Sequence, residues 1–427
     1  MQRTILLILL ACTHLLPLSA QYCNDARFTA SDYFSEAQII SEFNVSYGLA
    51  DQWFMDLPQP GLNTFDICYP DMAIDPMNTR PLIVLIHGGG FWGGEKESLS
   101  YYVNELAKSG YVAVAANYRK GWLGSPYDCD GDAESLETAI YRAMQDVHAC
   151  LRFLVAHADV YGIDTSRIYA GGESAGAYAL MNTVYISQDE WDSAHPGYHD
   201  LYGTIAGVTN DLDNTFTLSG IINFWGGLED TACVAKSEAV PTVSFYGNLD
   251  DVVPPYAGTI QNCPEYANVF GSEGIAEYLN TVGVCHEEHM NPLQGHEAYD
   301  PVYTTDHIAC FIKSLLCNSC SSAVYNFSDA DCADDYVVTT GIQAASGLSL
   351  NLFPNPATER MHVQIPQDWQ PVSQFRITDL SGKYVAVDWQ VTGSIAYAYV
   401  NDLAPGIYQV TCSDGSHVAC GRFMVSK

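Results

Sequence analysis

The sequence contains few basic residues. Lys and Arg total 17 against 50 Asp and Glu in 427 residues, which gives a formal net charge of −33. A surface of this sign repels nucleic acid, anionic lipid and polyuronates, so we expect no nucleic-acid partner. Adaptation to a salty exterior explains such a charge more simply than an acidic binding site does.

Long apolar runs are absent after the first twenty residues, "MQRTILLILLACTHLLPLSA". That opening has one Arg, a short apolar stretch and small residues before Gln21, a pattern typical of a removable signal peptide. No later run has the length of a membrane span. We therefore expect an exported, soluble product with no membrane span.

Motifs for metals and nucleotides are also missing. Neither a Gly-Lys-Ser/Thr phosphate loop nor a Gly-x-Gly-x-x-Gly fingerprint occurs at the glycine-rich stretches. The acidic run "DCDGDAESLE" has its glycine at the fourth position, where a calcium loop needs it at the sixth. Cys317 and Cys320 form a CxxC pair without a second one, which favours disulfides over zinc. The sequence thus predicts no metal and no cofactor.

Cysteine is plentiful, with 14 in the chain and one of them, Cys12, in the expected signal. Export makes disulfides the default for the rest, and their odd number leaves at least one thiol unpaired or intermolecular. Cys412 with Cys420 and Cys129 with Cys150 are geometrically feasible pairs. The pairing as a whole stays open.

Strand-like and helix-like runs alternate between residues 64 and 317, which predicts a mostly parallel sheet with helices on both faces. The runs expected to be strands include "PLIVLIHGGG", "YVAVAANYR", "RIYAGGES", "LSGIINFWGG" and "VPTVSFYGNLD". Apolar residues at helical spacing from Leu136 to Leu154 predict a helix before "RIYAGGES". The segment "YTTDHIACFIKSLL" predicts a closing helix.

Changes in composition divide the chain. We expect a signal peptide at 1–20, a catalytic domain at 21–317, a linker at 318–347 and a small all-β sandwich at 348–427. Within the catalytic domain, residues 185–215 interrupt the alternation and are rich in Trp, Tyr, Asp and Asn. They are either a partial cap over a site or a long surface loop.

The motif Gly-x-Ser-x-Gly at residues 172–176 lies between a predicted strand and a run of small residues. Small neighbours are needed where a strand turns sharply into a helix and the two pass close to each other. The hydroxyl of Ser174 would then stand exposed at the carboxyl edge of the sheet, beside a helix N-terminus that favours developing negative charge. This arrangement predicts a nucleophile.

Two further elements complete the expected chemistry. The stretch "IHGGGFWGG" leaves backbone amides uncovered, as an oxyanion site requires, and His87 within it is expected to be structural. Asp250 ends a predicted strand and His296 follows a glycine in a later loop, so they can serve as orienting acid and base. Asp251 is the rival acid. His286 and His289 in "CHEEH" are interpreted as a polar loop.

Together these motifs resemble the α/β-hydrolase superfamily, specifically secreted esterases with an HGGG oxyanion loop, including feruloyl-esterase-like and acetyl-xylan-esterase-like members. The resemblance rests on "FDICYP", "HGGGFWGG", "NYR", "YGIDTSRIYAGGESAGA", "GNLDDVVP" and "GH". It implies that Ser174 is the nucleophile, His296 the base and Asp250 the orienting acid. It also implies an oxyanion hole formed by the amides of Gly89, Gly90 and Ala175.

The tail is similar to a second family. "LNLFPNPATERMHVQI", "ITDLSGKYV", "LAPGIYQV" and "FMVSK" resemble the C-terminal sorting domain of the type IX secretion system of Bacteroidetes. This resemblance implies secretion machinery as a partner. It also implies that the protein passes through the periplasm and is then secreted or attached to the cell surface.

The leading hypothesis is a secreted serine carboxylic-ester hydrolase that acts on small-molecule or polysaccharide-linked esters, with short-acyl or aromatic groups, through an acyl-enzyme. The alternatives are a serine peptidase or amidase of the same fold and a non-catalytic binding or adhesion protein. Five aromatic residues are candidates for lining an acyl or aromatic pocket: Trp92, Trp191, Tyr198, Tyr202 and Trp225.

Overall fold

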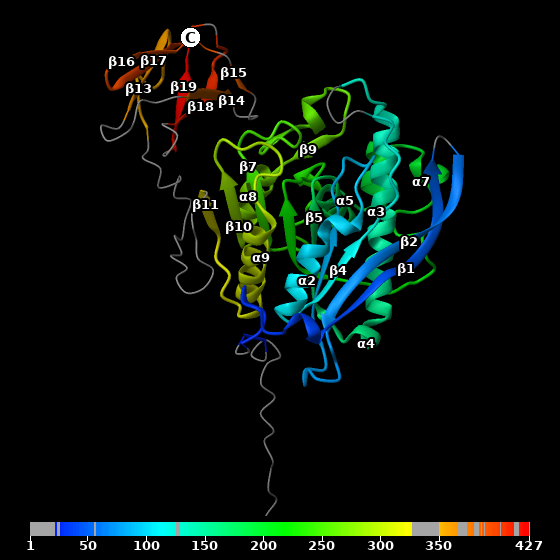
Figure 1. Cartoon of the computed structure of the whole chain (residues 1–427). Coiled ribbons are helices and arrows are strands. Elements are labelled where there is room, and N and C mark those ends of the chain that lie inside the picture. The colour runs from blue at the N-terminus through cyan, green and yellow to red at the C-terminus, as the bar shows by residue number, and fades with distance from the viewer. Residues whose placement is uncertain are drawn as a thin grey trace, which may run out of the picture.

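A computed structural model gives the fold of the chain (Figure 1). It describes residues 22–23, 26–54, 57–124, 129–326, 350–365, 374–379, 384–385, 387, 389–401, 403–413 and 418–426. The expected signal peptide and most of the expected linker lie outside the described residues. Among the helices of the described part, none has the length and hydropathy of a membrane span.

A nine-stranded sheet forms the larger unit, in the order β1-β2-β4-β3-β5-β6-β7-β10-β11. The strands are β1 Ile39–Phe54, β2 Leu57–Pro70, β3 Arg80–Ile86, β4 Val112–Ala116, β5 Ile163–Glu173, β6 Leu218–Phe224, β7 Thr242–Gly247, β10 His286–Asn291 and β11 Ala323–Asn326. β1, β2 and β4 pair antiparallel, and the pairings from β4 to β11 are parallel. The predicted mostly parallel sheet is confirmed.

Helices cover both faces of this sheet (Figure 1). They are α2 Ser100–Lys108, α3 Ala133–Ala156, α4 Ala158–Tyr161, α5 Ala175–Tyr185, α6 Gln188–Ala194, α7 Tyr198–Tyr202, α8 Ser272–Val282 and α9 Pro301–Leu316. β3 is buried along its whole length, and its side chains alternate between two cores. Leu82 and Val84 pack with α3 and α5, whereas Ile83 and Leu85 pack with α2 and α9. From Leu82 to Ile86, this strand is therefore apolar on both faces.

The insertion at 185–215 packs on α3 through α6 and α7. Trp191 is buried in the core that includes α3, and its ring contacts Tyr141 and Tyr198. His195 lies 3.3 Å from Glu137 and 3.0 Å from Glu229. These carboxylates outweigh the effect of burial and raise the pKa of His195 to about 9. A charged histidine thus ties the insertion to α3 and to the segment after β6.

The disulfides differ from the pair expected for Cys129. Cys129 bonds to Cys263, while Cys150 is buried on α3 as a free thiol in the apolar core. Both cysteines of the CxxC pair form disulfides, but with distant partners, as Cys23–Cys317 and Cys285–Cys320. Cys310 is also disulfide-bonded. In the tail, strand pairing places Cys412 opposite Ala419 and therefore one position away from Cys420.

The linker expected from residue 318 is wrong at its start. β11, at Ala323–Asn326, pairs in parallel with β10 as the last strand of the large sheet. The preceding Cys320 is bonded to Cys285, immediately before β10. Backbone pairing and the disulfide thus extend the larger unit through residue 326, where the polar composition alone suggested a linker.

The C-terminal unit has two four-stranded antiparallel sheets, β12-β13-β17-β16 and β15-β14-β18-β19. Their strands are β12 Asn351–Phe353, β13 Arg360–Gln364, β14 Gln374–Asp379, β15 Tyr384–Val385, β16 Trp389–Thr392, β17 Ile395–Tyr399, β18 Gly406–Ser413 and β19 Val418–Val425. Met361 and Val363 from one sheet share a core with Val410 and Phe423 from the other. The expected small β domain is confirmed.

We predict that a mature chain ending at residue 345 keeps the stability of the larger unit, whereas one ending at residue 317 loses it. The shorter chain lacks β11, which exposes the edge of β10, and it lacks the Cys285–Cys320 disulfide. Loss of the disulfide alone should lower the free energy of unfolding by about 2–4 kcal/mol. Urea denaturation of both chains, with Cys285→Ser/Cys320→Ser as a control for the bond, measures this. Equal stability of all three would refute the role of β11 and its disulfide.

Candidate active site

Ser174 lies in a sharp turn between a strand and a helix. β5 ends at Glu173 and α5 begins at Ala175, so one residue reverses the chain direction. Ser174 has φ 51° and ψ −116°, a backbone conformation that side chains rarely adopt. Such a residue costs on the order of 1–3 kcal/mol and persists where its surroundings hold it. Here the Ser174 N–H donates to the carbonyl of Phe224 on β6 at 2.9 Å.

The glycines on either side of Ser174 are required by close backbone contact. A Cβ on Gly172 would lie 2.4 Å from the carbonyl oxygen of Ile86, and one on Gly176 would lie 2.2 Å from the same atom. Both distances are too short for real carbon atoms, so only glycine lets α5 approach the end of β3 this closely. This is the contact that the Gly-x-Ser-x-Gly spacing predicts.

The structure brings the three predicted triad residues together. His296 Nε2 lies 2.8 Å from Ser174 Oγ, and His296 Nδ1 lies 2.8 Å from Asp250 Oδ2. A carboxylate only accepts hydrogen bonds, so Nδ1 carries the proton and Nε2 accepts from the serine hydroxyl. Three side chains distant in sequence thus form one chain of hydrogen bonds.

Asp250 is fixed in the turn after β7. Its Oδ1 accepts from the N–H groups of Val252 and Val253, each at 2.9 Å, which leaves Oδ2 for His296. Its side chain is 1% exposed. The rival Asp251 is exposed, so the structure places the first of the two acids against the histidine.

The glycine loop after β3 runs beside Ser174. A Cβ on Gly88 would lie 3.4 Å from the Cβ of Ser174, which places this backbone next to the hydroxyl. Gly89 and Gly90 have φ 111° and 60°, and the Gly89 carbonyl accepts from the Gly93 N–H at 2.9 Å. Ala175 opens α5, where backbone N–H groups favour negative charge. The loop and the helix N-terminus therefore lie beside the same serine.

His87 is buried and stacked on Tyr118, with ring centroids 4.5 Å apart. Its Nδ1 lies 2.6 Å from the carbonyl oxygen of Gly88. Burial lowers the pKa of His87 to about 4, so the ring is neutral and packs as part of the loop. These contacts fit the structural part that we expected for it.

Glu173 is a residue of this site that the sequence did not predict. It immediately precedes Ser174, and burial together with the charge of Glu297 raises its pKa to about 7. In the sequence, Glu173 is marked only by its place in the Gly-x-Ser-x-Gly motif, where it occupies the variable position before the serine. Glu297 follows His296, so two carboxyl groups flank the serine and the histidine.

The five aromatic pocket candidates separate into two groups. The Trp225 ring centroid is 6.4 Å from that of His296, and Trp92 is half exposed beside Gly90, whose Cβ would lie 3.1 Å from the Trp92 ring. The other three, Trp191, Tyr198 and Tyr202, each contact Tyr141 of α3. Only the first pair lies beside the predicted site residues.

We predict that Glu173→Gln changes the pH dependence of stability. The folded protein raises the pKa of Glu173 from 4.5 to about 7, so between these pH values the folded state binds more protons than the unfolded state. The contribution of Glu173 to the free energy of unfolding therefore falls as pH rises through that interval. The free energy of unfolding of the variant should exceed that of wild type by about 1–2 kcal/mol at pH 8 and should differ little from it at pH 5. Urea denaturation at both pH values measures the difference. A gain of the same size at both would show that Glu173 does not titrate there.

Comparisons with known proteins match both units of the chain. A model of the BD-FAE family matches residues 65–239, and a model of the secretion system C-terminal sorting domain matches residues 351–426. Among solved structures, a truncated carbohydrate esterase from gut microbiota is 18% identical and covers 66% of this chain and 99% of its own, with a TM-score of 0.44.

Curated relatives share a shorter segment. The neuroligin-like protein glit-1 of Caenorhabditis elegans is 30% identical over 171 residues, which are 37% of this chain and 22% of that protein. The fumonisin B1 esterase of Sphingopyxis macrogoltabida is 33% identical over 126 residues, or 27% of this chain and 22% of that one. The chain thus spans about a fifth of the length of these relatives. The expected resemblances are confirmed: residues 65–239 are similar to the esterase-like BD-FAE family, and residues 351–426 are similar to the secretion system C-terminal sorting domain.

Proposed function

We propose that the protein is a serine carboxylic-ester hydrolase. The observation that carries this proposal is the hydrogen-bonded series Ser174, His296 and Asp250, with the glycine loop and the N-terminus of α5 beside the serine. A serine alone is a weak nucleophile, and it becomes effective when a base and an orienting acid are in contact with it. The match to the BD-FAE family supports the same class of reaction.

The reaction proceeds in two halves through an acyl-enzyme. Ser174 Oγ attacks the ester carbonyl carbon while His296 Nε2 takes the hydroxyl proton, and Asp250 stabilises the imidazolium through Nδ1. The N–H groups of Gly89, Gly90 and Ala175 stabilise the oxyanion that forms. The ester bond then breaks as His296 returns the proton to the departing alcohol.

Water completes the cycle. His296 removes a proton from a water molecule, whose oxygen attacks the acyl carbon and forms a second oxyanion at the same amides. The bond to Ser174 Oγ breaks, the serine regains its proton from His296, and the carboxylic acid leaves. No other reactant is needed.

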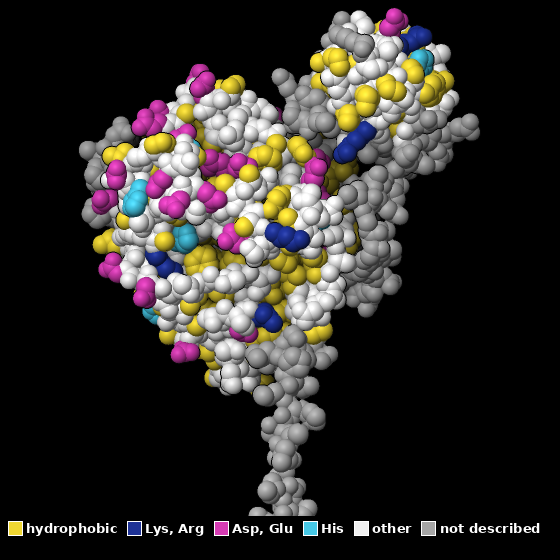
Figure 2. Space-filling model, turned by 180° about the vertical axis from the view of Figure 1, so that it is seen from behind, with side chains coloured by type: hydrophobic (Ala, Val, Ile, Leu, Met, Phe, Trp, Pro, Cys, Tyr) yellow, Lys and Arg dark blue, Asp and Glu magenta, His cyan; other side chains and the backbone are white. Residues whose placement is uncertain are grey.

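Neutral esters with a short acyl or aromatic group are the proposed substrates, including those linked to plant cell-wall polysaccharides. The half-exposed Trp92 ring beside Gly90 offers a flat apolar surface to an aromatic or sugar ring. Acidic side chains are spread over the face drawn in Figure 2, where basic side chains are few. Glu297, which follows His296, adds an acidic group next to the triad.

Export would bring the enzyme to such substrates. The sorting domain indicates secretion or attachment at the cell surface. We propose that the chain crosses the periplasm and that secretion machinery recognises residues 348–427. The triad candidates all lie outside this segment.

We predict that Ser174→Ala abolishes covalent labelling by a fluorophosphonate and lowers kcat/KM for p-nitrophenyl acetate by about four orders of magnitude, because triad members act as a unit. Asp250→Asn should cost about 10⁴-fold in kcat, whereas the exposed Asp251→Asn should cost less than about threefold.

Gel fluorescence and steady-state kinetics on the three variants give these values. Labelling that survives in Ser174→Ala would refute the nucleophile, and a larger loss in Asp251→Asn would move the acid by one residue. Wild-type activity confined to p-nitroanilide peptides would indicate a peptidase. A folded wild-type protein that is neither labelled nor active would indicate a binding protein.

We predict that a neutral aromatic ester is cleaved faster than a matched ester bearing a carboxylate on its alcohol, because the protein surface repels the anion. The ratio of kcat/KM should be at least about tenfold at low ionic strength and should shrink as salt screens the charges. Assays at two salt concentrations measure it. Faster cleavage of the anionic ester at low salt would contradict the proposed preference.

A further inference from the structure

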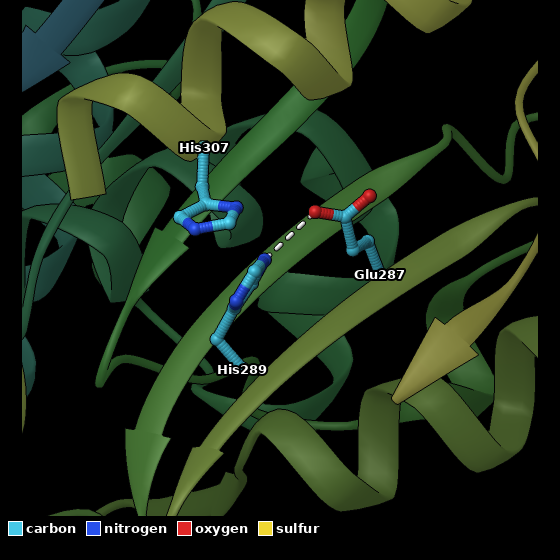
Figure 3. A group of neighbouring side chains, drawn as sticks. All are labelled: Glu287, His289 and His307. Atoms are coloured by element: carbon cyan, nitrogen blue, oxygen red, sulfur yellow. Dashed lines mark hydrogen bonds and ion pairs between the residues drawn. The ribbon is translucent and has the colours of Figure 1, made fainter. Parts of the chain in front are cut away.

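Three buried side chains converge on one face of the large sheet, apart from the triad. Glu287 and His289 belong to β10 and His307 belongs to α9. Figure 3 shows the three groups turned toward one another. One carboxylate oxygen and one nitrogen from each imidazole all lie within 4.8 Å of each other. These atoms are the kinds that bind transition metals in proteins.

The strand and the helix explain why the three meet. Glu287 and His289 are two positions apart on β10, so they point to the same face of the sheet. α9 packs on this face, in the core that contains Phe245 and Tyr299. The three side chains belong to residues that are 0% to 4% exposed. The cluster is therefore enclosed by secondary structure and does not depend on a surface loop.

The ring of His289 is held in a single orientation. It is stacked between Phe245 and Tyr325, with centroid distances of 4.7 and 5.0 Å. Its Nδ1 lies 2.9 Å from the hydroxyl of Tyr303, which leaves Nε2 facing Glu287 Oε1 at 2.7 Å. Metal-binding histidines have the same arrangement, with one ring nitrogen on the metal and the other hydrogen-bonded to a fixed partner.

A cation suits the composition of the cluster. Glu287 Oε1 lies 2.7 Å from His289 Nε2, and both side chains are enclosed. Buried carboxylates in proteins are paired or coordinate a metal, so a carboxylate that meets two imidazoles in the interior is a chemically reasonable ligand set.

We propose that Glu287, His289 and His307 form a metal site and that Zn²⁺ is its preferred ion. Two imidazole nitrogens and one carboxylate oxygen suit this borderline ion better than Ca²⁺ or Mg²⁺, which prefer oxygen ligands. With bond lengths near 2.1 Å, tetrahedral ligand atoms lie about 3.4 Å apart, so the contact between Glu287 and His289 would open slightly. Three protein ligands leave a fourth position for water.

The metal would join two elements that flank the loop of His296. β10 ends at Asn291 and α9 begins at Pro301, so the loop between them carries the histidine. Asn291 Nδ2 donates to the carbonyl of Ala298 at 2.8 Å, which closes the base of this loop. A bond between Glu287 and His307 through the metal would strengthen the same junction. This inference goes beyond the proposed ester hydrolysis and does not depend on it.

The experiment measures bound zinc and thermal stability in the tag-free mature protein. After incubation with zinc and removal of excess ion, elemental analysis should find about one zinc per chain in wild type and less than about 0.2 in His307→Gln. Removing zinc with dipicolinate should lower Tm by about 5 °C in wild type and leave the variant unchanged.

His286→Gln is the matched control. This histidine is also buried on β10, but it is an odd number of positions from Glu287 and His289 and points to the opposite face. The control should keep zinc at the wild-type level. Equal zinc loss in the control and in His307→Gln, or less than about 0.1 zinc per wild-type chain, would overturn the proposal.

X-ray absorption on the wild type keeps the test decisive if His307→Gln does not fold. The zinc-edge spectrum should show nitrogen and oxygen neighbours at about 2.0–2.1 Å and the outer-shell scattering of two imidazoles. A spectrum without imidazole scattering would assign the zinc to other groups and would refute this site.

Discussion

The close approach of α5 to the end of β3 is the constraint on which the site depends. Gly172 and Gly176 let the backbone on both sides of Ser174 lie against the carbonyl of Ile86, and any side chain there would push the helix away. The same contact brings the glycine loop that follows β3 next to Ser174. One backbone contact thereby places the proposed nucleophile and the amides of the glycine loop side by side. The strained backbone of Ser174 is stable because strands on both sides of β5 hold it.

The order of strands places the remaining groups. In a parallel sheet the carboxyl ends of neighbouring strands lie at one edge, where ligands bind in open α/β sheets. Asp250 follows β7 and His296 follows β10, and these two strands are paired neighbours. Their loops therefore meet without a long connection. Ser174 follows β5, which is separated from β10 by β6 and β7, so the loop after β10 carries His296 across the ends of these two strands to Ser174 Oγ.

Apolar periodicity was sufficient for much of the fold and insufficient for β10. The helix Ala133–Ala156 and the strand Arg80–Ile86 have regular apolar patterns, and both were predicted. β10 reads "HEEHMN", which we interpreted as a polar loop, and that interpretation is wrong. Its side chains are buried because β7 and β11 pair with it and α8 and α9 cover its two faces. These neighbours are distant in sequence, so the residues of β10 alone do not predict that the strand is buried.

The same limit explains which of the proposed site residues could be predicted from the sequence. Ser174, Asp250 and His296 each stand in a short motif at a strand end, so spacing along the chain was enough to select them. Glu287, His289 and His307 are divided between a strand and a helix, with no motif that joins them. The disulfide partners of Cys129 and Cys320 likewise depend on the tertiary fold.

β10 differs in its chemistry from the other central strands. On one face Glu287 contacts His289, and on the other the hydroxyl of Tyr246 donates to Glu288 at 2.9 Å. Burial, with the charge of Glu273, raises the pKa of Glu288 to about 8. β3 has one ionisable residue, Arg80 at its start, whereas four of the six residues of β10 are Glu or His, and their hydrogen bonds depend on their protonation states. The strand that carries the loop of His296 is therefore held on both faces by ionisable side chains.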